Sequence, residues 1–190
     1  MPSENAPSPR DWPLHSEEPG PHLGLMRVQF QNLTNPRTGR PFRATVLMTG
    51  SYVNVLPITR DREFVLVEQY RFGRSRVTLE APAGLIHSGE DPAECALREL
   101  REETGYTGGS IVSLGAVEPN PAFMNNQCYH FLVRGCARTH DQEQDPGEDL
   151  VVRLLTEEQV VAKVRDGTIN NALTLTLLSR VLDIRFPYEP

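Results

Sequence analysis

Residues 84–106 constrain this chain more than any other stretch. The segment opens as a glycine-bounded loop and continues with the start and stop signals of a helix. Asp91 is a favourable helix cap and Pro92 suits the first helical position. Gly105 fits just beyond the last turn, where a left-handed residue commonly ends a helix. We therefore predict a helix between Asp91 and Gly105.

Three carboxylates on this predicted helix share one face. Glu99, Glu102 and Glu103 are three and four residues apart, so their side chains lie close together. Like charges at this spacing repel each other, and a bound cation would remove the conflict. Mg²⁺ takes oxygen ligands, usually a few carboxylates together with substrate phosphates. Arg98 lies on the same flank, where it could orient one of the carboxylates.

The hexapeptide at residues 98–103 is by itself more typical of a solvated helix face, with ion pairs such as that of Glu94 with Arg98. The longer pattern favours a functional site. It reads Gly84, five residues, Glu90, seven residues, Arg98-Glu99, an aliphatic residue, any residue, Glu102-Glu103, any residue and Gly105. Seven fixed residues at roughly 6% usage each coincide by chance about once in 10⁸ to 10⁹ windows. The pattern resembles the signature of the Nudix hydrolase family, with no departure at a fixed position.

This resemblance implies a fold, a reaction and a cofactor. The fold would be an α/β/α sandwich with a mixed β-sheet. The reaction would be cleavage of a nucleoside diphosphate linked to another moiety, and it would require Mg²⁺ or Mn²⁺. The resemblance places Glu102 and Arg98 in catalysis, and it assigns the metal to Glu99, Glu102, Glu103 and the carbonyl of Ala83.

Two short stretches before this pattern resemble the ADP-ribose pyrophosphatase branch of the family. Arg71 follows Gln69-Tyr70, as does an arginine that meets the substrate diphosphate in that branch. The alternative is a surface arginine, but a guanidinium fork suits a phosphate well. Glu80 opens a Glu-x-Pro-Ala-Gly segment, and we regard it as a weaker candidate for holding substrate or water at the metal.

A loop after the pattern is a further candidate for substrate binding. Pro121 lies at the offset where the same branch keeps a proline, but Ala122 and Asn126 replace the glycine and the acid that usually follow. This departure leaves the preferred substrate open. Asn126 could hydrogen-bond a sugar or a base, whereas asparagines in such loops also simply stabilise turns.

An acidic stretch at residues 139–148 contains our candidate for the general base. Relatives carry a catalytic glutamate on the loop before the next strand, and Glu148 after Gly147 matches that setting. Its neighbours Asp149 and Glu143 are alternatives, and a solvated acidic loop without a catalytic role is the simplest rival.

The chain divides into three predicted parts. Residues 1–22 are rich in Pro, Ser and Glu without periodicity, which predicts a flexible tail. Residues 23–58 alternate like strands and predict a small antiparallel β lobe. Residues 59–190 would form the Nudix domain. In relatives such a lobe is exchanged between subunits, so the resemblance implies a homodimer.

Composition narrows the possible partners and compartments. The net charge of −6 argues against a nucleic-acid surface. The three cysteines show no disulfide or zinc spacing, which fits a reducing compartment. No apolar run approaches the length of a membrane span, so we expect no membrane association and a cytoplasmic location.

We therefore expect Mg²⁺-dependent hydrolysis of a nucleoside diphosphate sugar to a nucleoside monophosphate and a sugar phosphate. The runner-up is cleavage of nucleoside triphosphates. A second alternative, from another class, is a module that binds nucleotide sugars without cleaving them.

Overall fold

The computed structural model describes residues 8–185 of the chain. The chain divides into two compact units. One unit contains the N-terminal residues through Thr49 together with Asn120–Asn126. The other contains Gly50–Pro119 and the chain from Gln127 onward.

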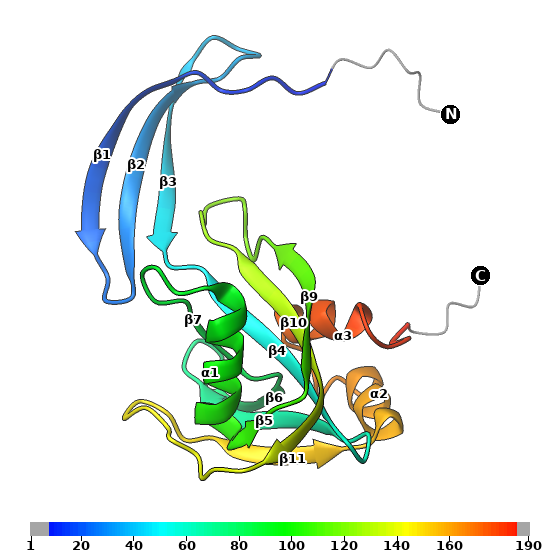
Figure 1. The fold of residues 1–190 in the computed structure, drawn as a ribbon. Coiled ribbons are helices and arrows are strands. Elements are labelled where there is room, and N and C mark those ends of the chain that lie inside the picture. The colour runs from blue at the N-terminus through cyan, green and yellow to red at the C-terminus, as the bar shows by residue number, and fades with distance from the viewer. Residues whose placement is uncertain (1–7, 186–190) are drawn as a thin grey trace, which may run out of the picture. The chain divides into compact units, whose positions relative to one another are not determined.

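The N-terminal unit is built on a three-stranded antiparallel sheet. Its strands are β1 (Leu14–His22), β2 (Met26–Thr34) and β3 (Pro41–Thr49), in that spatial order (Figure 1). The backbone N–H groups of Arg37 and Thr38 donate to Asn35 Oδ1 and close the turn between β2 and β3. This unit is the antiparallel lobe that the sequence predicted.

The boundaries of this lobe differ from the predicted ones at both ends. Strand β1 lies within residues 1–22, which the sequence predicted to be a flexible tail. Its side chains are mostly exposed, so burial gives no periodic signal, and pairing with β2 holds it in place. At the other end the unit stops at Thr49, and the predicted lobe residues beyond it contribute a strand to the second sheet. The first seven residues of the predicted tail lie outside the described part.

The second unit contains an eight-stranded mixed sheet. Its central order is β11-β5-β4-β10-β8, with β6 on β5, β7 on β4 and β9 on β10. The β4–β10 pair is parallel and the other pairs are antiparallel. Its strands are β4 (Tyr52–Thr59), β5 (Phe64–Arg71), β6 (Arg76–Glu80), β7 (Ala83–Leu85), β8 (Tyr106–Thr107), β9 (Ser110–Val117), β10 (Cys128–Arg138) and β11 (Val151–Leu155). Its helices are α1 (Pro92–Thr104), α2 (Glu157–Arg165) and α3 (Ala172–Ser179).

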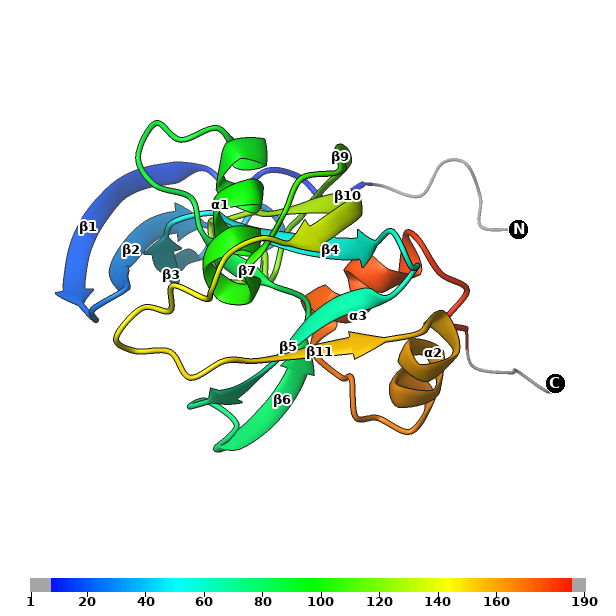
Figure 2. The same ribbon diagram turned by 60° about the horizontal axis from the view of Figure 1, so that its bottom comes forward.

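Helices cover both faces of this sheet. Along β4, Val53 and Val55 pack with the buried side of α1, whereas Leu56 packs with α2 and α3. Successive side chains of a strand point to opposite faces, so both faces of a central strand can be apolar only if both are covered. Figure 2 shows α1 on one side of β4 and β5 and the other two helices on the opposite side. The predicted α/β/α sandwich is confirmed. No helix in residues 8–185 is long and apolar enough to cross a membrane.

His130 on β10 is the unusual residue of this core. It is fully buried, and neither ring nitrogen has a hydrogen-bond partner among the described residues. Burial, with a smaller contribution from the charge of Arg180, lowers the pKa of His130 to about 4. His130 is therefore a neutral core residue at physiological pH, and it lies on the sheet face opposite α1.

We expect His130 to make the fold sensitive to acid. The pKa of this histidine is 6.5 in the unfolded chain and about 4 in the folded protein. Between these two pH values the unfolded chain is protonated at His130 and the folded protein is not. Its contribution to the unfolding free energy should therefore fall across this window, by about 3 kcal/mol in total. Urea denaturation measures the unfolding free energy of the parent and of His130→Leu at several pH values between 6.5 and about 4. The parent should lose about 3 kcal/mol more than the variant over this range. A parallel decline of the two proteins would contradict the assignment.

Candidate active site

Helix α1 is fixed at both ends by local interactions. Asp91 Oδ1 accepts hydrogen bonds from the backbone N–H groups of Ala93 and Glu94 at 2.8 and 3.3 Å. Gly105 has a φ of 74° and its N–H donates to the Arg101 carbonyl. These are the caps that the sequence predicted. They fix where the helix begins and ends.

The three predicted carboxylates gather where α1 passes β7. Glu103 is 2% exposed, and its Oε2 accepts a hydrogen bond of 3.0 Å from the backbone N–H of Ala83. Glu99 is 9% exposed and lies against Gly84, where an added Cβ would come 1.9 Å from the Glu99 carboxyl carbon. Glu102 is more exposed, on the same flank. Strand β7 thus packs directly on two of the three carboxylates.

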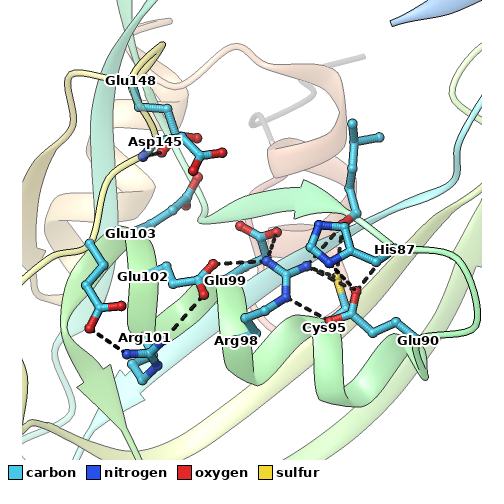
Figure 3. Close-up of polar contacts among 12 residues, drawn as sticks. His87, Glu90, Cys95, Arg98, Glu99, Arg101, Glu102, Glu103, Asp145 and Glu148 are labelled. Carbon is cyan, nitrogen blue, oxygen red and sulfur yellow. Dashed lines mark hydrogen bonds and ion pairs between the residues drawn. The ribbon is translucent and has the colours of Figure 1, made fainter.

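Arg98 holds this flank together. Its Nη1 lies 2.7 Å from Glu99 Oε1 and 3.0 Å from Glu102 Oε2, so one guanidinium nitrogen bridges two carboxylates (Figure 3). Its Nε donates to Glu90 Oε1 at 2.8 Å. The Arg98 hydrogen bond lowers the pKa of Glu90 to about 2. Arg98 thus contacts the carboxylates that it was expected to orient, and Glu90 anchors it; its predicted part in catalysis stays a prediction.

Two of these carboxylates lie in surroundings that disfavour their charged form. Burial raises the pKa of Glu103 well above its usual range, and the charges of Glu99 and Glu148 raise it further. Burial also raises the pKa of Glu99, in spite of the Arg98 guanidinium. A group of carboxylates that resists ionisation is costly to the fold and is typical of a functional site.

The donor set fits a hard divalent cation. Among residues 8–185 no three His, Cys, Asp or Glu side chains form a ready-made metal cage. Arg98 holds Glu99 and Glu102, while the Ala83 N–H holds Glu103. Two of the three carboxylates nevertheless already converge on one positive group. Carboxylate oxygens are the ligands that Mg²⁺ and Mn²⁺ prefer.

The acidic stretch at residues 139–148 is anchored on the C-terminal end of α1. Gln142 Nε2 donates to the Glu103 carbonyl at 2.6 Å, and the Glu143 N–H donates to the Glu102 carbonyl at 2.8 Å. Arg101 forms an ion pair of 2.8 Å with Glu143. The low apolar content of this stretch predicts a flexible loop, and the sequence did not reveal these anchors. They join residues about forty positions apart, which leaves no local signal.

Glu148, one of the three candidate bases, faces the carboxylates (Figure 3). Its Oε2 accepts a hydrogen bond from the Asp145 N–H at 3.1 Å, which bends the loop back on itself. Figure 3 shows its carboxylate directed toward Glu103, and its charge raises the pKa of Glu103 and Glu99. Glu143 instead pairs with Arg101. This arrangement favours Glu148 over Glu143.

Arg71 and Glu80 form an ion pair at the ends of β5 and β6. Arg71 Nη2 lies 2.6 Å from Glu80 Oε2, and Arg71 Nε lies 3.1 and 3.2 Å from the two carboxylate oxygens. Burial alone would raise the pKa of Glu80, but hydrogen bonds from Arg71 and Thr78 lower it, so Glu80 is ionised. The sequence assigned the two residues separate contacts and did not predict this pair. The charges of Glu103 and Glu148 also raise the pKa of Arg71, which places the ion pair beside the acidic cluster.

Pro121 and Asn126 belong to the N-terminal unit. They lie in the segment Asn120–Asn126, which joins β3 through the Leu47 N–H donating to the Phe123 carbonyl at 2.7 Å. Asn126 is buried. Their contact with substrate stays a prediction.

The chain is similar to several known proteins in sequence and in fold. The NUDIX domain profile matches residues 48–175. An ADP-ribose pyrophosphatase of Bacillus subtilis (strain 168) is 29% identical over 150 residues, covering 79% of this chain and 75% of that protein. A methanol dehydrogenase activator of Bacillus methanolicus is 27% identical over 154 residues, covering 80% and 82%. A crystal structure of an ADP compounds hydrolase superposes with a TM-score of 0.82 at 21% identity, covering 93% of this chain and 95% of that one.

Proposed function

The chain belongs to the Nudix family, and from this premise we propose that it cleaves the diphosphate bond of a nucleoside diphosphate linked to a sugar, with ADP-ribose as the first substrate to test. The products would be a nucleoside monophosphate and a sugar phosphate. The observation that supports this best is the convergence of Glu99, Glu102 and Glu103 beside the β7 backbone. The name of the Bacillus subtilis relative supports the choice of ADP-ribose.

The carboxylates would hold one or more divalent cations. Glu99, Glu102, Glu103 and the Ala83 carbonyl are the proposed ligands. A bound divalent cation neutralises charge on the diphosphate and favours ionisation of an attacking water. Arg98 keeps Glu99 and Glu102 on one flank, and Gly84 leaves room for the Glu99 carboxylate.

The remaining residues would orient the substrate and move the proton. Glu148 takes the proton of the water that attacks one phosphorus, and the phosphorus–oxygen bond to the other phosphate then breaks. Arg71 would bind the diphosphate with the part of its guanidinium that Glu80 leaves open. Its side chain is 42% exposed, whereas that of Glu80 is 3% exposed. In this arrangement Glu80 holds Arg71 in place.

A substrate panel tests the proposal. We expect release of AMP and ribose phosphate from ADP-ribose in Mg²⁺, identified by mass, and no release when the metal is chelated. Preferential hydrolysis of nucleoside triphosphates would favour the runner-up activity. Binding of ADP-ribose without turnover would favour a binding module. Light scattering in solution tests the predicted homodimer.

Glu148→Gln should lower kcat by roughly 10²–10³-fold, the usual scale for loss of a general base. The side chain is exposed and lies on a surface loop, so the melting temperature should stay unchanged. Asp149→Asn, at the adjacent exposed position, is the matched control and should keep full activity. If Asp149→Asn is the slower enzyme, the base is assigned to the wrong residue.

A further inference from the structure

A pocket opens at the Arg71–Glu80 pair, which forms part of its lining. It has a volume of about 640 Å³, and its lining includes Arg71, Arg74, Arg76, Thr78, Glu80 and Asn170. This volume is in the range of small-molecule sites. The buried Thr78 and Glu80 and the half-buried Arg71 carry polar groups inside it, and the exposed Arg74 and Arg76 form its rim.

The pocket is positively charged in an acidic protein. Three arginines face one carboxylate, whereas the whole chain has a net charge of −6. Arg71 is neutralised by Glu80. Neither Arg74 nor Arg76 forms an ion pair with any residue from 8 to 185. Two uncompensated positive charges thus remain at this rim.

The fold brings these arginines together at a cost. Arg71 and Arg76 are directly paired across the β5–β6 hairpin, and like charges at opposed positions destabilise a sheet. The turn between them is tight, since the Arg74 N–H donates to the Arg71 carbonyl at 3.0 Å and the Ser75 N–H donates to the Phe72 carbonyl at 3.2 Å. The hairpin therefore places three arginines in the lining of one pocket, where an anionic ligand would be stabilised.

The pocket adjoins the proposed catalytic cluster. Arg71 lines the pocket, and it lies close enough to Glu103 and Glu148 to interact with their charges. A diphosphate held at the acidic cluster would therefore leave one of its two substituents near Arg74 and Arg76. A phosphate monoester on that substituent would meet two planar donors that bind phosphate oxygens in pairs.

We propose that Arg74 and Arg76 bind an additional phosphate group of the substrate, so that the enzyme prefers nucleoside diphosphate sugars that carry a phosphate monoester. The inference rests on the proposed function, because it places the scissile diphosphate at the acidic cluster. It adds a specificity site that the signature residues do not include.

The test compares three substrates in the full-length protein. They are ADP-ribose, ADP-ribose phosphorylated on its terminal ribose, and ADP-ribose phosphorylated on its adenosine ribose. The parent should show a higher kcat/KM for one of the phosphorylated forms, and the identity of that form tells which half enters the pocket. In the double variant Arg74→Gln/Arg76→Gln, this preference should fall by at least tenfold, about the effect of losing one charge-assisted hydrogen bond.

The double variant Arg60→Gln/Arg62→Gln is the matched control. Arg60 and Arg62 are exposed residues of the β4–β5 turn, and their replacement removes the same net charge. This control should keep the preference. Equal values of kcat/KM for all three substrates in the parent, or an unchanged preference in Arg74→Gln/Arg76→Gln, would overturn the proposal.

A binding measurement separates this proposal from the proposed reaction. If none of the three compounds is hydrolysed, the proposed function fails, and calorimetric titration of the same compounds still reports on the pocket. Tighter binding of one phosphorylated form, weakened at least tenfold in Arg74→Gln/Arg76→Gln, would support the pocket. Equal affinities would overturn it.

Discussion

Glu103→Gln should lower kcat for ADP-ribose hydrolysis by about 10³-fold, because it removes a buried proposed ligand of the cation that stabilises charge in the transition state. Glu103 is 2% exposed, and the Ala83 N–H is its hydrogen-bond donor. Glutamine keeps the size of the side chain and an oxygen that can accept this bond. The variant isolates the charge from the packing.

The same variant should be at least as stable as the parent. Burial and the charges of Glu99 and Glu148 disfavour ionisation of Glu103 in the folded protein. A neutral amide removes this penalty, so the melting temperature in the absence of metal should stay equal or rise. Glu94→Gln, an exposed position of the same helix, is the matched control and should change neither quantity. Full activity of Glu103→Gln would overturn the proposed role of this residue.

Gly84→Ala should lower kcat by about 10²-fold with little change in stability. The new methyl group would lie 1.9 Å from the Glu99 carboxyl carbon and 2.0 and 2.2 Å from its oxygens. The carboxylate must therefore move, and it can do so because it ends a flexible side chain. Misplacement of a catalytic group by about 1 Å is enough for a loss of this size.

Two further variants make this explanation specific. Gly50→Ala adds a methyl group in ordinary contact, 3.6 Å from Leu85 Cδ2, and should leave kcat unchanged. In a Glu99→Gln background, Gly84→Ala should lower kcat by a much smaller factor than it does in the parent, because both changes act through the Glu99 carboxylate. Fully additive losses would show that Gly84 acts by another route.

Helix α1 could be predicted from the sequence because its determinants are local. Asp91 and Gly105 cap the helix within a few residues of its ends. The spacing of the glutamates places them on one flank. The spacing of Ala93, Ala96, Leu97 and Leu100 also predicts one apolar stripe, but Leu97 is 39% exposed and Cys95 is buried in its place.

Features that depend on distant residues were missed. The Arg71–Glu80 ion pair joins side chains that are not cross-strand partners, since β5 and β6 pair Arg71 with Arg76, and the sequence did not reveal it. The anchors of the Glu148 loop join Gln142 to the Glu103 carbonyl across the fold. Strand β1 carries polar side chains and depends on backbone pairing with β2. None of these has a periodic pattern or a motif in the sequence.

The account depends on the acidic flank of α1 gathering divalent cations. Titration with Mn²⁺, with the free ion followed by electron paramagnetic resonance, measures this without any substrate. We expect the parent to bind Mn²⁺, Glu94→Gln to bind it equally well, and Glu103→Gln to bind it at least about tenfold more weakly. Equal Mn²⁺ affinity in all three proteins, or no binding by the parent, would contradict the account.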